Sequence, residues 1–366
     1  MKFKILKNYL GNLIRKKLFG LANQVDANFS DSYIKKSKIN QEKVDKYPII
    51  LPKKSSLESG FEVVERYIKE NNIDINKEFN FVKNVDLEFK NALKYSRRIF
   101  KLIKKINSDL IKSYQDLGRN EDIVELFVEV KIQDELWDKL KQHTQEKWGN
   151  IKMGFTKVPE ELILKNRLIL YPYALILIQE LKKKRINSAP TMEAGFETLR
   201  VYESLGKITN DIANWLRNRS IRCQANHPVG GLTVFPALAG KAGMGGQGKA
   251  GLLITPEFGS RVRLSTIYMG QKIFNFTDSS EHDWIQDYCK TCGICSRICP
   301  GGAILEKKRI RIENIEGIGQ LRTCIDVFKC YKYFSSKYGC SMCIKTCPFS
   351  KGNGIYNKIK EKFQNN

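Results

Sequence analysis

The chain has 366 residues, of which 42% are hydrophobic, and its formal net charge is +24 at pH 7. A chain of this length holds about two or three domains, and it contains no run of about 18 apolar residues that would predict a membrane-spanning helix. The positive charge fits a nucleic-acid, anionic-membrane or acidic redox partner, or lysines spread over solvated faces. Because the lysines run throughout the chain without one dense block, we favour the last interpretation.

The N-terminal part of the chain is predicted to be helical. A basic amphipathic helix is expected over 1–22, followed by a polar linker over 23–55. Ser59 and Glu62 then form a capping-box signature ahead of an apolar helical face. The whole of 56–150 is mostly helical in pattern and rich in lysine, and it contains no motif that predicts a function.

Between residues 151 and 280 short apolar runs alternate with helical patterns, as in an α/β layer structure. The predicted strands are 168–171, 252–255 and 261–268. A long helix is expected over 193–219, with its apolar residues on one face. We therefore expect a second domain over 151–280, distinct in texture from the helical part before it.

A glycine-rich connection, 240–251, matches two phosphate-binding motifs incompletely. The spacing from Gly243 to Gly248 fits G-x-G-x-x-G, but here the glycines precede a strand instead of following one. Ala250 stands where a P-loop requires Ser or Thr to bind magnesium. Nucleotide binding is therefore disfavoured. Closely spaced glycines instead let the backbone approach a large planar or anionic ligand without a side-chain clash.

A third incomplete motif lies just before this connection. Corrinoid-dependent methyltransferases and mutases bind cobalt through Asp-x-His-x-x-Gly, whereas this chain has Ala225 at the position of the Asp, followed by His227 and Gly230. We therefore do not interpret His227 as a lower cobalt ligand. The alternative is a loop residue preceding Pro228.

The most specific pattern is formed by cysteines, nine of which lie between residues 289 and 347. The two runs are Cys289-x2-Cys292-x2-Cys295-x3-Cys299-Pro300 and Cys340-x2-Cys343-x3-Cys347-Pro348. A [4Fe–4S] cube takes one thiolate per iron, and in two-cluster ferredoxins the cysteine before proline binds the other cube. Structural zinc instead uses two CxxC knuckles separated by a longer loop. The spacing therefore predicts two [4Fe–4S] clusters in a module spanning 281–366.

This pattern predicts crossed ligation of the two clusters. One cluster is expected on Cys289, Cys292, Cys295 and Cys347. The second is expected on Cys299, Cys340, Cys343 and an upstream cysteine, either Cys324 or Cys330. Thiols gathered for iron indicate a reducing compartment, and the N-terminus shows no signal-peptide pattern. We therefore expect a cytoplasmic protein.

The glycine-rich turn in AGKAGMGGQGKAGLLITPEFGSRVRL, together with the cysteine module, resembles the reductive dehalogenases and epoxyqueuosine reductases. The resemblance covers roughly residues 150–355. It implies an α+β fold, in which the helical N-terminal region precedes a nitroreductase-related α/β corrinoid-type domain and a two-cluster ferredoxin-like module. The segment around Lys329-Cys330-Tyr331 also resembles this family, which favours Cys330 over Cys324 as the last ligand.

The resemblance implies a function as well. Single electrons from a low-potential donor such as ferredoxin or flavodoxin would pass through the two clusters to a base-off corrinoid. Reduction would then cleave a leaving group from a small-molecule substrate. The implied catalytic candidates are Tyr202, Asn226, His227 and Arg263. The implied corrinoid-binding candidates are Gly243, Gly245, Gly246, Gly248 and Lys249.

The chain also departs from this family. Epoxyqueuosine reductases carry an acid in an Asp-Thr-Ala-Pro stretch, whereas the corresponding 225–228 has no carboxylate. No helical-repeat extension follows the cluster module, and no twin-arginine leader is recognised. The substrate is therefore not predicted, and two alternatives stay open. One is a two-cluster electron-transfer protein without corrinoid, and the other is a tRNA-modifying reductase whose positive charge binds the tRNA backbone.

Overall fold

The computed structural model describes most of the chain from residue 57 onward and a short piece before it. The described residues are 21–22, 24–26, 28, 57–73, 89–120, 132–315, 317–336 and 339–365. The helix predicted over 1–22 and the linker predicted over 23–55 therefore lie almost wholly outside them. Within the described ranges, no helix is both long enough and apolar enough to cross a membrane.

The helical N-terminal part contains α4 (Gly60–Glu70), α6 (Phe89–Gln115) and α7 (Asp134–Trp148). α4 begins with the predicted capping box. The Glu62 N–H donates to Ser59 Oγ at 3.2 Å, and the Ser59 N–H donates to the Glu62 carboxylate at 2.8 Å. These two bonds satisfy amides that a helix start otherwise leaves without partners, so the prediction is confirmed.

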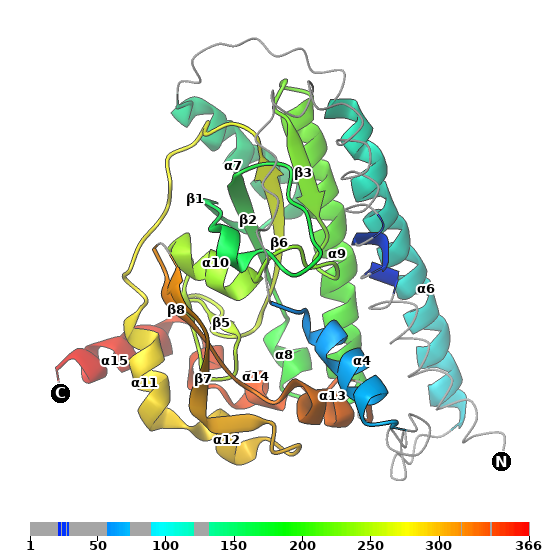
Figure 1. Ribbon diagram of the computed structural model, residues 1–366, viewed down its shortest axis with the longest axis vertical. Coiled ribbons are helices and arrows are strands. Elements are labelled where there is room, and N and C mark those ends of the chain that lie inside the picture. The colour runs from blue at the N-terminus through cyan, green and yellow to red at the C-terminus, as the bar shows by residue number, and fades with distance from the viewer. Residues whose placement is uncertain are drawn as a thin grey trace.

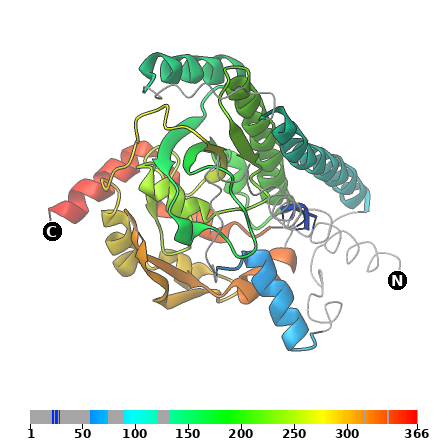
Figure 2. The same cartoon turned by 45° about the horizontal axis from the view of Figure 1, so that its top comes forward.

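The central element is the long helix α9 (Met192–Arg217), which lies alongside α6 (Figures 1 and 2). Thr191 caps it, since its hydroxyl accepts a hydrogen bond from the Ala194 N–H. Apolar side chains from both helices form one buried cluster, made by Ile99, Ile103, Ile106, Met192, Phe196 and Leu199. The helix predicted over 193–219 is thus observed, with an end two residues earlier.

Four antiparallel strands form the main sheet. Their order across the sheet is β1 (Lys152–Lys157), β2 (Tyr173–Glu180), β6 (Val262–Met269) and β3 (Cys223–Asn226). Because successive side chains of a strand point to opposite faces, β2 contributes to two separate cores. Leu175 and Leu177 pack with α9 and α7, whereas Ile176 and Ile178 pack with α10 (Phe235–Lys241) on the other face.

The strand predicted over 168–171 is not present. These four residues are buried but irregular, and β2 begins only at Tyr173. The side chain of Gln224 takes the place of a neighbouring strand: its Oε1 accepts from the Leu170 N–H at 2.8 Å, and its Nε2 donates to the Leu168 carbonyl at 3.3 Å. Apart from a single bridge residue, Ile169, the apolar run therefore reflects burial and not strand pairing.

The glycine-rich connection forms a short ribbon of β4 (Gly246–Gln247) and β5 (Leu253–Ile254). The predicted strand 252–255 is thus present only as this two-residue element. A short helix, α8 (Lys183–Ile186), precedes α9. The C-terminal elements are α11 (Trp284–Cys292), α12 (Ile294–Ile298), β7 (Ile304–Ile315), β8 (Gly319–Ile325), α13 (Val327–Ser336), α14 (Met342–Thr346) and α15 (Asn353–Gln364).

The C-terminal elements are joined to the start of β6 by close backbone contacts. Arg261 Nε donates to the Ser350 carbonyl at 2.8 Å, and the Ser260 and Ser350 hydroxyls lie 3.1 Å apart. Gly259 has a φ of +59°, and a Cβ there would lie 2.3 Å from the Phe349 carbonyl carbon. Only glycine fits this position, because the backbone after α14 rests directly on it.

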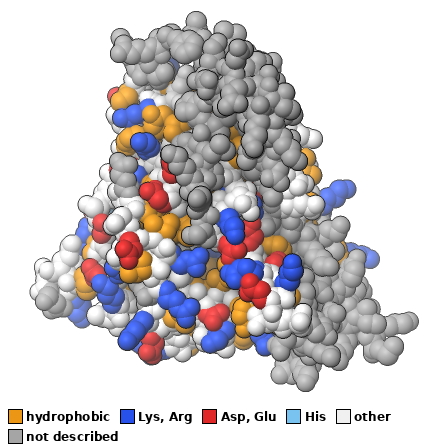
Figure 3. All heavy atoms as spheres, viewed as in Figure 1, with side chains coloured by type: hydrophobic (Ala, Val, Ile, Leu, Met, Phe, Trp, Pro, Cys, Tyr) orange, Lys and Arg blue, Asp and Glu red, His pale blue; other side chains and the backbone are white. Residues whose placement is uncertain are grey.

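Charged side chains of both signs cover the described surface in the view of Figure 3. There, Lys and Arg are interspersed with Asp and Glu and do not form one block. On this face the charge therefore resembles a mixed solvated surface more than a single basic groove.

Candidate metal centre

Three cysteines of the first run are brought together by a break between two helices. Cys289 and Cys292 lie on the last turn of α11, and Cys295 lies on the first turn of α12. Gly293 between them has a φ of +55°, a left-handed conformation that ends α11 and lets the chain turn at once into α12. The x2-x2 spacing and the turn at Gly293 thus bring the three cysteines close together.

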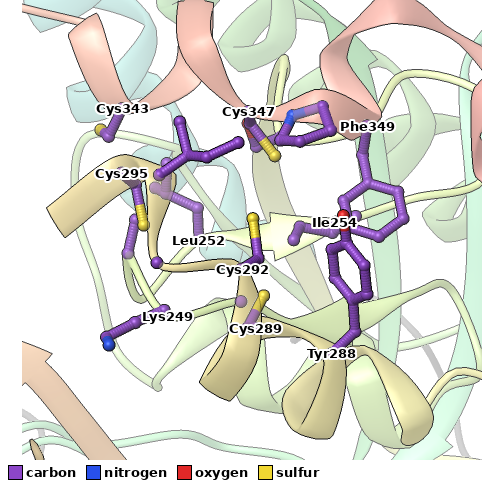
Figure 4. Close-up of a pocket in the computed structure, with 16 residues that line it drawn as sticks. Lys249, Leu252, Ile254, Tyr288, Cys289, Cys292, Cys295, Cys343, Cys347 and Phe349 are labelled. Atoms are coloured by element: carbon purple, nitrogen blue, oxygen red, sulfur yellow. The ribbon is translucent and has the colours of Figure 1, made fainter. Parts of the chain in front are cut away.

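A fourth cysteine reaches the same point from the second run. Cys347 follows α14, and its sulfur points into the pocket formed by Cys289, Cys292 and Cys295, whereas the Cys343 sulfur points away from it (Figure 4). Four sulfurs from two separate runs therefore face one pocket. We call this group of four cysteines the first site.

Hydrogen-bond donors surround the first site. The backbone N–H of Lys249 bonds to the Cys289 sulfur, and the Ser260 hydroxyl bonds to Cys347. The side chains of Tyr288 and Cys292 are also hydrogen-bonded to each other. Such donors stabilise the negative charge on cluster thiolates and tune the potential. Ser260 and Tyr288 lie outside the cysteine motifs, and no sequence signal marks either of them.

Burial makes the thiols of the first site reluctant to ionise on their own. It raises the pKa of Cys289 to about 12 and that of Cys347 to about 11. Neighbouring thiols raise these pKa values further, which shows how close the sulfurs lie. Since iron binds the thiolate, loading this site must release protons.

The remaining predicted ligands form a second site beside the first. Burial raises the pKa of Cys343 to about 12 and that of Cys330 to about 11. The thiols that raise the Cys343 pKa further include Cys330, Cys340 and Cys299. The Cys299 sulfur also accepts a hydrogen bond from the Ala303 N–H at 3.3 Å. Cys295 of the first site also raises the pKa of Cys343, so the two sites are neighbours.

The two upstream cysteines differ in position. Cys330 lies on α13, and Cys299 and Cys340 both raise its pKa, which places it in the second site. Cys324 lies on β8 with only 2% of its surface exposed. This arrangement favours Cys330 as the ligand.

The donor set fits a cubane better than a single ion. Among the described residues, no group of three or more His, Cys, Asp or Glu side chains is arranged to hold one metal ion. A zinc ion draws four ligands onto one centre, whereas a [4Fe–4S] cube takes each thiolate on a different iron. Two neighbouring sets of four sulfurs meet the second requirement.

Two of the predicted catalytic residues lie together. The Arg263 guanidinium sits 5.4 Å from the centre of the Tyr202 ring, at the packing of β6 against α9. Its terminal nitrogens donate to the Val262 carbonyl at 2.9 Å and to Thr198 Oγ1 at 3.5 Å. Tyr202 is only partly buried and packs against the α6–α9 cluster.

Asn226, the last residue of β3, and His227, the first residue after it, are both enclosed. Asn226 Nδ2 donates to the Gly230 carbonyl at 2.7 Å, and its Oδ1 accepts from the Leu232 N–H at 3.1 Å. His227 is 1% exposed, its Nδ1 accepts from the Val229 N–H at 3.2 Å, and burial lowers its pKa to about 3. Both side chains thus hold the loop, and their catalytic role stays a prediction.

We expect Gly206→Ala to destabilise the protein because its methyl group would collide with His227. A Cβ built on Gly206 in α9 would lie 2.0 Å from His227 Nε2. Overpacking of this kind costs about 1–3 kcal/mol, which thermal or urea unfolding measures. Gly240→Ala in α10 is the control, since its Cβ would meet nothing closer than 3.5 Å. Equal stability of the two variants would show that the ring has room to move.

The predicted corrinoid-binding glycines serve the protein's own packing. A Cβ on Gly245 would lie 2.2 Å from the Ile254 carbonyl oxygen, and one on Gly246 would lie 2.5 Å from that of His282. A Cβ on Gly243 would likewise meet the Thr277 carbonyl at 2.5 Å. Close backbone packing therefore requires these glycines, and Gly243 also lines an open pocket with Met244 and Glu257. The role of this run in binding a corrinoid stays a prediction. Gly248 and Lys249 instead line the pocket of the first site.

The fold and the cysteine sites define the class of this protein as an iron–sulfur protein with a ferredoxin-type module. The family model for the 4Fe-4S binding domain matches residues 282–305, which include the whole first cysteine run. The chain is related to the reductive dehalogenases and epoxyqueuosine reductases, as the following comparisons show.

The curated relatives match the chain over part of their length. Over 122 residues the chain is 36% identical to a tetrachloroethene reductive dehalogenase of Sulfurospirillum multivorans. The aligned region covers 32% of this chain and 24% of that protein. Over 121 residues it is 31% identical to an epoxyqueuosine reductase of Listeria monocytogenes, covering 33% of this chain and 30% of that protein. The matched region thus spans about a quarter to a third of these relatives.

Solved structures show the same fold. A reductive dehalogenase, described for B12-dependent dehalogenation, aligns with a TM-score of 0.54 and 16% identity over 79% of this chain and 44% of that chain. The catabolic reductive dehalogenase NpRdhA aligns with a TM-score of 0.51 and 18% identity over 58% of this chain and 32% of that chain. The relatives and the shared fold together support the predicted relationship to the reductive dehalogenases and epoxyqueuosine reductases.

Proposed function

We propose that this protein is an iron–sulfur reductase that passes single electrons through two [4Fe–4S] clusters. The observation that carries the proposal is the gathering of eight predicted cysteine ligands into two neighbouring groups of four. Each cluster supplies reversible one-electron transfer when bound. The chain itself supplies the thiolates, the hydrogen bonds to sulfur and the burial that keeps water away from the first site.

The most exposed and the most buried of the eight cysteines suggest a direction for the electrons. Cys330 of the second site has the most exposed residue surface, Cys289 of the first site is 8% exposed, and the other six are intermediate. The first site also faces the glycine-rich ribbon of the sheet domain. We therefore propose that a low-potential donor such as ferredoxin or flavodoxin delivers electrons at the second site, and that they leave from the first.

The similarity to reductive dehalogenases supports a corrinoid as the electron acceptor and reductive removal of a leaving group from a small molecule as the reaction. The corrinoid-binding residues that the sequence predicts stay part of this proposal, and one of them, Gly243, lines an open pocket together with Glu257 and His282. The similarity to epoxyqueuosine reductases favours a tRNA substrate as the alternative, whose binding would weaken steeply with salt.

We expect protein reconstituted anaerobically to hold about eight irons and eight sulfides per chain. After reduction, EPR should show two interacting one-electron clusters, because Cys295 and Cys343 place the two sites side by side. About four irons per chain would contradict the proposal. On the same sample, extraction of a stoichiometric corrinoid would identify the acceptor, whereas its absence would leave a two-cluster electron-transfer protein.

A further inference from the structure

The second site reaches the surface of the protein through α13. One face of this helix packs on α4 and is formed by Val327, Phe328 and Tyr331. The residues between them in sequence, Lys329 and Cys330, are exposed, and so is Lys332. The ligand Cys330 therefore lies on the part of α13 that faces away from α4, between two exposed lysines.

The end of α12 lies against the same helix. A Cβ built on Gly301 would lie 3.1 Å from Tyr333 Cβ and 3.2 Å from the Lys329 carbonyl oxygen, so the turn after Cys299 rests directly on α13. Ile298, which immediately precedes Cys299, is 44% exposed. An apolar side chain thus lies at the surface beside the second site.

The charge around these two ligands is positive. Over 297–303 and 326–334 the cations outnumber the acids, since the charged residues are Arg297, Lys329, Lys332 and Asp326. Two acids at the start of the neighbouring α4 are already paired with cations. Glu62 accepts from Arg167 at 2.8 Å, and Glu58 accepts from Arg66 at 2.8 Å. The exposed lysines of α13 therefore set the sign of the local field.

We propose that the exposed face around Cys330, which we call the entry surface, docks an acidic one-electron carrier protein. The entry surface is formed by Arg297, Ile298, Lys329, Cys330 and Lys332. The inference rests on the proposed two-cluster function and names the partner of its second site. The carrier loses one electron, the second cluster gains it, and no bond forms or breaks. Complexes of this kind bury little surface, and opposite charges steer the two proteins together.

The test is stopped-flow reduction of the reconstituted full chain by a reduced [2Fe–2S] ferredoxin of net negative charge. The double variant Lys329→Glu/Lys332→Glu is expected to lower the second-order rate constant about tenfold or more at low salt. This difference should shrink at about 1 M salt, where charges are screened within about 3 Å. The matched control is Lys139→Glu/Lys141→Glu on α7, at the opposite end of the molecule from α13 (Figure 1), where 64% and 52% of the two side chains are exposed.

Reduced methyl viologen, a small cation that needs no docking surface, should reduce the α13 double variant no more slowly than the wild type. Equal ferredoxin rates in the two double variants would overturn the entry surface. Slower reduction by methyl viologen as well would place the effect on the cluster and would also overturn it. If the α13 variant loses affinity for a tRNA but keeps the ferredoxin rate, the surface binds nucleic acid and the proposal is wrong. A wild-type content of about four irons would instead overturn the two-cluster function itself.

Discussion

Replacing Cys299 by serine is expected to remove the second cluster, although Cys299 belongs to the first cysteine run. Its neighbours in space are Cys330, Cys340 and Cys343, not the three cysteines that precede it. Loss of one thiolate ligand leaves one iron of that cube without its bond to the protein, which destabilises the cluster. Iron should fall from about eight to about four per chain, and reduced samples should keep the EPR signal of the first site.

The matched variant is Cys295→Ser, which removes a ligand of the first site from α12, the short helix that Cys299 follows. This variant should lower the iron content per chain by the same amount but keep the EPR signal of the second site. If Cys299→Ser and Cys295→Ser lose the same signal, each run binds its own cluster and the crossed assignment is wrong.

The two upstream cysteines are expected to respond very differently to alanine. Cys330→Ala should reduce the iron content by up to half, because Cys330 shares the second site with Cys299 and Cys340. Cys324→Ala should leave the iron content near normal, because Cys324 is buried in β8. Iron and sulfide analysis of both variants, purified in parallel, provides the measurement.

Each of these variants serves as the control for the other, since both remove one thiol from neighbouring elements. Loss of iron from Cys324→Ala with retention in Cys330→Ala would assign the ligand to β8. Thermal unfolding of both proteins separates loss of a ligand from loss of the fold, because removing one buried thiol costs about 1 kcal/mol in a core that holds together.

The features that the sequence predicted correctly depend on neighbours along the chain. The capping box of Ser59 and Glu62 spans one helical turn, and the helix that became α9 shows its periodicity over many turns. The cysteine spacing of the first run is likewise local, since Gly293 allows the turn that the spacing requires. Such signals need no knowledge of the rest of the fold.

The features that sequence reasoning missed depend on distant partners. The run 168–171 looked like a strand, but the side chain of Gln224, more than 50 positions away, satisfies its backbone. The glycine run predicted a close approach to the backbone but not the approach of Ile254 to Gly245. Apolar runs and glycines show that a segment is buried or crowded, and they do not show by what.

Asp26 illustrates the same limit. It falls in the segment predicted as a polar linker, yet it is 1% exposed, and the Tyr114 hydroxyl donates to it. A Cβ on Gly230 would lie 2.8 Å from its carboxylate, and burial raises its pKa to about 6. No local pattern in the sequence marks Asp26 as a buried acid.

The contact between the chain after α14 and the start of β6 bears on how the protein matures. Cys347, held there by Ser260, lies about 60 residues after Cys289, and a cluster that joins them closes a loop of that length. A cross-link of this span stabilises a fold by roughly 4 kcal/mol. Because Ser260 lies just before β6 and bonds to Cys347, a cluster bound at the first site would tie the segment after α14 to the sheet. We therefore infer that insertion of this cluster follows the folding of the sheet.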